Sequence, residues 1–295
     1  MKIGRYELHA LDTGRFALDG GAMFGVVPRA LWEKTNPADG RNRIDMATRV
    51  LLLIGEGRKI IVDTGIGTKL SEKQRDIYRV DLTRFSMTNS LAALGLTAAD
   101  ITDVILTHLH FDHAGGAVER LNGELRPAFP GAKYYVQKRH WEWALKPTEK
   151  DRASFMNDDF LPLREHSVLT FIDGPGEIFT GVELVVVNGH TEAQQLVKVA
   201  DGSRTLLYCC DLIPMASHVP LPYIMGYDIR PLVTLEEKKR TLARALDEGW
   251  LLFIEHDPAA EIITVKRTEK GYAIKERLEL SHLTGEARIS ARGSA

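Results

Sequence analysis

The sequence predicts an α/β protein in which sheets are covered by helices. Two patterns support this prediction. Short runs typical of β-strands alternate with amphipathic segments along the chain, and several of the strand runs are wholly apolar. A strand without polar alternation is typically buried on both faces, because helices cover the outer face of its sheet. The 295 residues are 44% hydrophobic and 26% charged, which is the balance of a soluble globular protein.

Turn and capping signals place the individual elements. Gly55-Glu56-Gly57 and Asp201-Gly202 each lie between two strand-like runs and predict hairpins. Thr234, with Glu237 three residues later, predicts the start of a helix that ends at Gly249. The expected strands are 50–54, 59–62, 104–106, 133–136, 184–187, 196–199, 205–208, 250–254, 262–266 and 272–276, the last two forming a hairpin, and shorter helices are expected at 90–94 and 138–145.

Charge, cysteine content and hydropathy exclude several classes of protein. Thirty-eight Lys and Arg against 40 Asp and Glu give a formal charge of −2, which provides no overall basic field for nucleic acid or an anionic membrane. The adjacent Cys209-Cys210 cannot build a disulfide framework and predict buried thiols in a reducing compartment. The apolar runs are far shorter than the ~20 residues of a membrane span, and the N-terminus lacks the apolar run of a signal peptide.

These observations predict a soluble, cytoplasmic protein that binds neither nucleic acid nor a membrane. A homodimer is compatible with the sequence. No repeat, low-complexity tract or linker divides the chain, so a single domain of residues 1–295 is expected. The last ~10 residues are mostly small and polar, a composition typical of a disordered end.

The densest group of chemically active side chains follows the apolar run 104–106. His108, His110, Asp112 and His113 lie within six residues. On an extended backbone, two residues that are two positions apart point the same way, so His108 and His110 would share a direction. After a turn the other two could approach the same point, and Gly115-Gly116 would allow close backbone contact. Imidazole and carboxylate are the ligands of catalytic zinc and related metals, so this segment predicts a metal site.

Three more apolar runs end in potential metal ligands. His190, Asp211 and His256 each follow the carboxyl end of such a run. Any one of them alone could be an ordinary loop residue. Together with the first cluster they make seven ligands, which are too many for one tetrahedral zinc ion. Seven ligands suit two metals that share a carboxylate.

This set of motifs resembles the metallo-β-lactamase superfamily of dinuclear hydrolases. The T-H-x-H-x-D-H-x-G-G element at 107–116, the later G-H, D and H, and the upstream Val62-Asp63-Thr64-Gly65 occur in the superfamily's order over roughly residues 45–260. The segments 21–28 and 253–258 look more like its lactonase and organophosphate-hydrolase branch than like β-lactamases. The resemblance implies a four-layer αββα sandwich with the metals at one edge.

The resemblance also implies a role for each site residue. One metal would bind His108, His110 and His190, the other would bind Asp112, His113 and His256, Asp211 would bridge them, and Asp63 would accept a hydrogen bond from a ligand histidine. The two divalent transition metals, with zinc as first choice and Mn, Fe or Co as alternatives, would hold a bridging hydroxide that cleaves an ester or lactone. Asp112 and Asp211 are the candidate catalytic residues, and Asp112 would pass a proton to the leaving group.

The residues expected to contact the substrate are Met23, Phe24 and His218. Lactonases of this superfamily carry a tyrosine shortly after the bridging aspartate, whereas residues 212–218 contain none, and His218 could replace it. Tyr223 and Tyr227 lie further along the chain. Four alternatives therefore stay open: a thioester or glyoxalase-type hydrolase, an organophosphate hydrolase, a phosphodiesterase or nuclease, and a metal-binding protein with a silent site.

Overall fold

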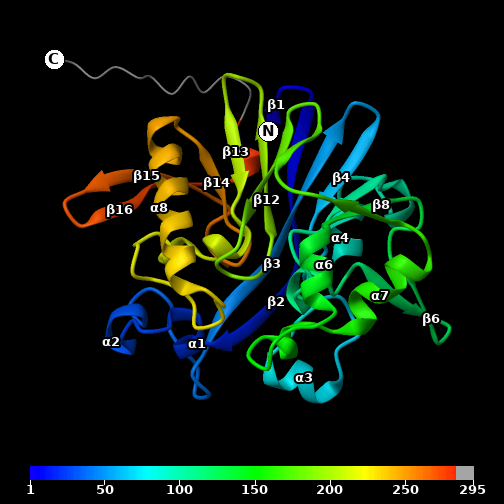
Figure 1. Ribbon diagram of the computed structural model, residues 1–295, viewed down its shortest axis with the longest axis horizontal. Helices are drawn as coiled ribbons and strands as arrows, with labels where there is room; N and C mark the ends of the chain where they lie inside the picture. The colour runs from blue at the N-terminus through cyan, green and yellow to red at the C-terminus, as the bar shows by residue number, and fades with distance from the viewer. Residues whose placement is uncertain (284–295) are drawn as a thin grey trace.

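Two seven-stranded sheets form the centre of the protein (Figure 1). The computed structural model describes residues 1–283. The first sheet has the strand order β1 (Lys2–Ile3), β2 (Tyr6–Asp19), β3 (Arg43–Gly55), β4 (Arg58–Val62), β5 (Asp103–Ile105), β8 (Lys133–Gln137) and β9 (Leu169–Ile172). The second sheet has the order β10 (Gly176–Phe179), β11 (Val182–Val187), β12 (Gln194–Ala200), β13 (Thr205–Tyr208), β14 (Leu251–Phe253), β15 (Ile262–Thr268) and β16 (Gly271–Leu278).

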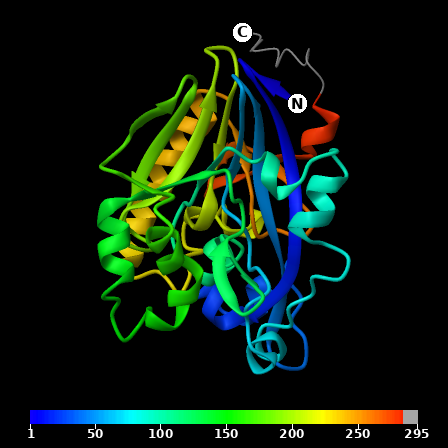
Figure 2. The ribbon, with the colours of Figure 1, turned by 90° about the vertical axis from the view of Figure 1, so that its right-hand side faces the viewer.

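Helices flank the two sheets (Figure 1). They are α1 (Gly20–Phe24), α2 (Arg29–Trp32), α3 (Glu72–Ile77), α4 (Met87–Ala92), α5 (Phe111–Ala114), α6 (Lys138–Ala144), α7 (Asn157–Glu165) and α8 (Pro231–Asp247). Short 3₁₀ helices span Ala98–Asp100, Arg152–Ser154, Cys210–Leu212, Ala216–His218 and Leu280–His282, and β6 (Val118–Leu121) pairs with β7 (Glu124–Pro127). In Figures 1 and 2, α4, α6 and α7 lie against the first sheet and α8 against the second. The expected αββα sandwich is confirmed.

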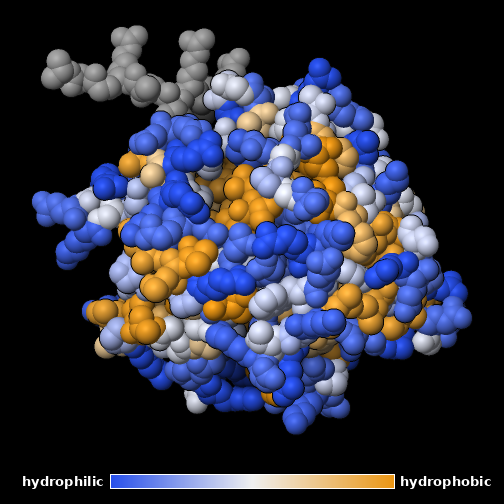
Figure 3. All heavy atoms as spheres, in the orientation of Figure 1, coloured by the Kyte–Doolittle hydropathy of each residue, from blue (hydrophilic) through white to orange (hydrophobic). Residues whose placement is uncertain are grey.

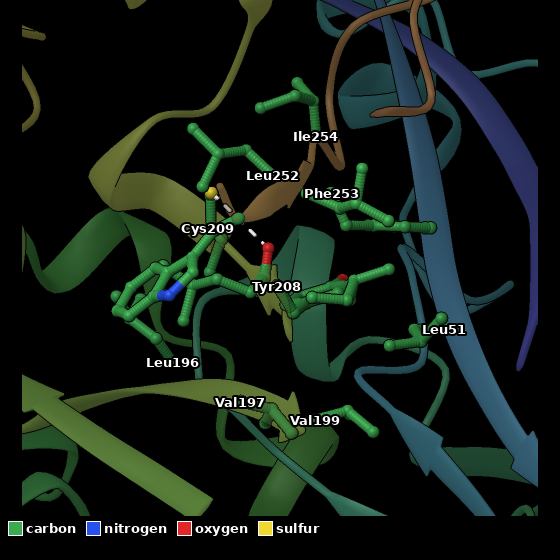
Figure 4. Close-up of a cluster of buried hydrophobic side chains, with 14 of the residues drawn as sticks. Leu51, Leu196, Val197, Val199, Tyr208, Cys209, Leu252, Phe253 and Ile254 are labelled. Carbon is green, nitrogen blue, oxygen red and sulfur yellow. Dashed lines mark hydrogen bonds between the residues drawn. The ribbon is translucent and has the colours of Figure 1, made fainter. Parts of the chain in front are cut away.

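Alternate side chains of the central strands enter different cores. In β3, Leu51 and Leu53 belong to the cluster between the two sheets, whereas Val50 and Leu52 belong to the cluster beneath α4, α6 and α7. Figure 4 shows Leu51 in the inter-sheet cluster together with Tyr208 of the second sheet. Because both faces of such a strand are buried, its sequence is a continuous apolar run.

The structure confirms the hairpins and corrects one helix. The three expected hairpins join β3 to β4, β12 to β13, and β15 to β16. The last long helix begins at Pro231 rather than at Thr234, because proline suits the first helical position, where its missing N–H is not needed. Thr234 lies inside the helix, and Glu237 hydrogen-bonds to another loop instead of forming a capping box. The sequence analysis missed the 14-residue strand β2, where polar residues interrupt the apolar pattern.

The surface shows no extended apolar belt on the face drawn in Figure 3, where hydrophobic side chains form separate groups among hydrophilic ones. Within residues 1–283, no helix has both the length and the apolarity needed to span a membrane. The expected disorder of the last ~10 residues concerns a segment outside the described residues.

The loops that follow β4 and β5 are in close backbone contact. Thr64 N donates a 2.8 Å hydrogen bond to the carbonyl of His113, and Gly116 N donates a 2.9 Å bond to the carbonyl of Gly65. A Cβ atom on Gly116 would lie 2.2 Å from the Thr64 carbonyl oxygen, which belongs to the backbone and cannot turn aside. The close approach expected at Gly115-Gly116 is therefore present.

We predict that Gly116→Ala lowers the free energy of unfolding by about 1–3 kcal/mol, because the added methyl group forces these two loops apart. Urea denaturation in one metal-replete buffer measures the change. Gly40→Ala is the matched control, since its Cβ would meet no atom within 4 Å, and we expect a change below about 0.5 kcal/mol. Equal unfolding midpoints for the two variants would show that the loop contact is not tight.

Candidate metal centre

Strand ends from both sheets carry the predicted site residues to one edge of the molecule. β4 and β5 run parallel, and Asp63 and the cluster that begins at His108 follow them. β13 and β14 also run parallel and lead to Asp211 and His256. β12 is antiparallel to both β11 and β13, so β11 runs in the same direction as β13 and leads to His190. All seven expected ligands are buried there.

Three histidines converge with Asp211 in the first ligand group. His110 Nδ1 lies 3.0 Å from His108 Nε2 and 3.1 Å from His190 Nε2. His190 Nε2 lies 3.0 Å from Asp211 Oδ2. Because these ring nitrogens cannot all direct protons at one another, the arrangement suits lone pairs that meet at a common cation.

Asp112, His113 and His256 form the second ligand group. His113 Nε2 and His256 Nε2 are 3.2 Å apart, and each lies 3.8 Å from an oxygen of Asp112. Asp211 lies between the two groups, with Oδ1 3.1 Å from His256 Nε2 and Oδ2 near the first group. The structure thus brings together the two groups that the resemblance implies, with one carboxylate within reach of both.

The donor atoms of this cluster fit divalent metals. Asp211 Oδ1 is buried and accepts no hydrogen bond, although His256 Nε2 is close, because the angle is unsuitable. A buried carboxylate oxygen without a partner destabilises a protein unless a cation compensates it. A set of imidazole nitrogens and carboxylate oxygens suits Zn, Mn, Fe or Co.

A hydrogen bond to Asp63 fixes the orientation of His113, and Glu255 lies close to the same ring nitrogen. His113 Nδ1 lies 3.1 Å from Asp63 Oδ2 and 3.2 Å from Glu255 Oε2. Asp63 also accepts hydrogen bonds from the backbone and the hydroxyl of Thr107, both at 2.7 Å. The contact expected between Asp63 and a ligand histidine is present, and it directs Nε2 of the ring into the cluster.

The other ring nitrogens of His190 and His256 are also engaged. His190 Nδ1 lies 2.8 Å from Asp228 Oδ1, and His256 Nδ1 lies 2.9 Å from the Ala47 carbonyl. The sequence analysis missed the roles of Asp228 and Glu255. Glu255 could have been noticed because it precedes His256 at a strand end, whereas Asp228 lies in an irregular segment that carries no motif.

Charge within the cluster shifts the ionisation of its members. Burial acts to lower the pKa of His190 and His256, but Asp211 is close to both and raises their pKa values to about 9. Burial acts to raise the pKa of Asp211, but His113 and the other two histidines outweigh it and hold the pKa well below its usual range. These opposite shifts reflect the close packing of Asp211 against histidines of both groups.

Two residues next to the ligands adopt left-handed backbone conformations. Asp63 has φ 62° and Cys210, which precedes Asp211, has φ 46°. Such conformations cost of order 1–3 kcal/mol in residues other than glycine and are concentrated at functional sites. Cys209 and Cys210 are both free and buried, and burial raises the pKa of each thiol. The expectation of buried thiols is confirmed.

A cavity of about 140 Å³ opens over the ligand groups. Its floor consists of the candidate ligands His110, Asp112, His190, Asp211 and His256. Its wall consists of Leu18, Met23, Met46, Tyr78, Phe111, Lys150, Ala153, Ser154, Met225 and Tyr227. The wall is mainly apolar, and Lys150 is its only charged member.

Met23 lines the cavity, whereas Phe24 and His218 lie behind it. The rings of Phe24 and His218 stack at 4.7 Å, and Phe24 also stacks on Trp32 at 5.2 Å. His218 Nε2 donates a 2.8 Å hydrogen bond to the Met23 carbonyl. Burial lowers the pKa of His218 to about 3, so its ring is neutral. The structure thus places Phe24 and His218 as supports of Met23 rather than in the cavity wall.

The wall includes a tyrosine from the segment that follows Asp211. Tyr227 lines the cavity, whereas Tyr223 packs edge-on against α1. Burial and the nearby Asp112 raise the pKa of Tyr227, so its phenol keeps its proton. Lys150 Nζ donates to the carbonyls of Gly226 at 2.7 Å and Tyr227 at 3.2 Å, which ties this wall to the loop before α7.

Comparisons with known proteins agree with this geometry. The family model described as the Metallo-beta-lactamase superfamily matches residues 44–256. A probable metallo-hydrolase of Mycobacterium tuberculosis is 26% identical over 242 residues, which cover 73% of this chain and 76% of the relative. An N-acyl homoserine lactonase of Bacillus thuringiensis subsp. kurstaki is 30% identical over 172 residues, which cover 57% of this chain and 61% of the lactonase.

A solved structure extends the similarity over nearly the whole chain. The crystal structure of a probable metal-dependent hydrolase from Staphylococcus aureus is 28% identical, covers 95% of this chain and 100% of its own, and superposes with a TM-score of 0.83. The matched residues 44–256 include Asp63 and all seven expected ligands. The chain belongs to the metallo-beta-lactamase superfamily of metal-dependent hydrolases.

Proposed function

We propose that the protein is a dinuclear metal-dependent hydrolase that cleaves an ester or lactone bond in a small molecule with an apolar part. The observation that carries this proposal is the place of Asp211, which lies within reach of two ligand groups directly beneath a mainly apolar cavity. The similarity to an N-acyl homoserine lactonase supports the choice of an ester or lactone.

The side chains of this cluster are arranged to hold two cations rigidly and to move one proton. Two bound divalent metals would supply a nucleophilic water of pKa ~7 and a Lewis acid for the attacked oxygen. Asp63 fixes the ring of His113, and Asp228 fixes that of His190. Asp112 lines the cavity, 3.8 Å from Nε2 of His113 and of His256, and would carry a proton to the leaving oxygen.

The cavity wall selects the substrate. Leu18, Met23 and Met46 offer an apolar surface to an acyl or aryl group. Tyr227 offers a phenol that stays protonated and can donate a hydrogen bond to the oxygen on which charge develops. A single wall lysine gives little support to a long phosphodiester chain, which requires several cationic contacts.

We predict measurable hydrolysis of aryl esters or acylated lactones and little or none of β-lactams. The rate should rise with pH through about neutrality, because the nucleophile is a water of pKa ~7. A panel that also contains thioesters, phosphotriesters and RNA tests the alternatives under the same conditions. Fast cleavage of RNA without ester or lactone hydrolysis would overturn the proposal in favour of a nuclease.

We predict that Tyr227→Phe lowers kcat by about 10²–10³-fold, as the loss of an oxyanion donor does, while metal content stays unchanged. Tyr223→Phe is the control, since this residue comes from the same segment but its ring lies outside the cavity. Steady-state kinetics and elemental analysis of both variants provide the comparison. If the two variants retain equal activity, Tyr227 does not contact the reacting group.

A further inference from the structure

Two adjacent charged side chains of α8 are buried beside the candidate active site. Glu237 exposes 5% of its surface and Lys238 exposes 0%. Of their neighbours, Glu236 is exposed and Lys239 is half-buried, and the two pair with each other at the surface. Because a buried charge destabilises a protein unless it is fully partnered, the partners of Glu237 and Lys238 indicate what each side chain holds in place.

Glu237 holds the loop that carries His190. Its Oε1 accepts a 2.8 Å hydrogen bond from Asn188 N, and its Oε2 accepts a 3.0 Å bond from Gly189 N. The same helix presses on this loop, since a Cβ on Gly189 would lie 2.3 Å from the hydroxyl oxygen of Thr234. The two residues before His190 are therefore fixed by one carboxylate, and only glycine fits at the second of them.

Lys238 holds a different segment. Its Nζ donates to the carbonyls of His218 at 2.9 Å, Pro220 at 3.0 Å and Tyr223 at 2.7 Å. An ammonium has three N–H donors, so each of them is used. Residues 219–230 have no regular secondary structure, and of these three carbonyls that of Pro220 also accepts a 3.1 Å hydrogen bond from Tyr223 N. Burial lowers the pKa of Lys238 to about 7, which reflects how fully the group is enclosed.

The segment held by Lys238 continues into the active site. Met225 and Tyr227 from this segment line the cavity. From Asp228 onward the chain is attached to the ligand loop instead: Asp228 bonds to His190 Nδ1, Ile229 N donates to the His190 carbonyl at 3.1 Å, and Arg230 N donates to the Gly189 carbonyl at 2.8 Å. Gly226 N donates to the Ala22 carbonyl at 2.8 Å, which attaches the same segment to α1. Neighbouring side chains of one helix thus reach a ligand loop on one side and the cavity wall on the other.

We infer that Glu237 and Lys238 are positioning residues with separate tasks: Glu237 sets the loop that presents His190 to the metal, and Lys238 sets the segment 218–227 that forms the substrate-facing wall. The second task rests on the proposed function, since the wall faces a substrate only if the cavity is the active site. A general contribution of both residues to stability would instead affect both parts of the site alike.

The test compares Glu237→Gln and Lys238→Met with the surface controls Glu236→Gln and Lys239→Met. For each variant we would measure metal retention against a chelator, hydrogen exchange of the amides in 219–227, and kcat/KM with and without excess metal. Glu237→Gln should weaken metal binding by about 10–100-fold, leave exchange in 219–227 unchanged, and regain kcat/KM when metal is added.

Lys238→Met should show the opposite pattern. Exchange in 219–227 should rise about tenfold or more, and kcat/KM should fall about 10–100-fold without recovery in excess metal. If Lys238→Met does not fold, Lys238→Gln retains two N–H donors and should show the same pattern more weakly. Both surface controls should behave like the wild type.

The inference is overturned if both buried variants lose metal and activity in parallel, or if neither Lys238 variant changes exchange in 219–227. Metal retention and hydrogen exchange need no substrate, so they decide the inference even if no ester or lactone is hydrolysed. If no ester or lactone in the panel is hydrolysed but metal retention and hydrogen exchange change as expected, the result counts against the proposed function alone.

Discussion

The carboxylate of Asp211 is the group on which the rest of the site depends. It is buried among histidines from both ligand groups, and one of its oxygens accepts no hydrogen bond. A buried charge of this kind is stable only if the positive partners are held in place. The sandwich meets this requirement because β5, β11, β13 and β14 all deliver their carboxyl ends to one edge, and the next residues of the chain supply the partners.

The structure adds supports in layers behind that carboxylate. Asp63, which has a left-handed backbone conformation, bonds to Nδ1 of His113, and Glu255 lies 3.2 Å from the same nitrogen. The loop after β4 can reach this place because Gly116 leaves room for the Thr64 carbonyl. Helix α8 supports the opposite side through Glu237 and Lys238. Residues far apart in the sequence therefore contribute to one rigid centre.

The sequence was most informative where a local pattern and the chemistry coincide. The runs 50–54 and 104–106 predicted interior strands because both faces of β3 and β5 are buried, and the ligands stood out because they directly follow such runs. Strand β2 was missed because its polar residues interrupt the apolar pattern. The sequence analysis missed the roles of Tyr227, Asp228 and Lys238. These roles depend on how the irregular segment 219–230 folds back against the site, and no periodicity in the sequence encodes that path. His218 was chosen for its closeness to Asp211 in sequence, but the 3₁₀ helix Ala216–His218 turns its ring toward the Met23 carbonyl.

The central claim is that Asp211 is shared by two metals. Elemental analysis of the purified wild type and of Asp211→Asn tests this claim most directly. Each protein is prepared with excess metal and then freed of unbound ions, and turnover is measured on the same samples. The account predicts two transition metals per chain in the wild type, and fewer metals with lower turnover in Asp211→Asn, because the amide removes a charge that both cations share. A firm value of one metal in the wild type, or two metals with near-normal turnover in Asp211→Asn, would contradict it.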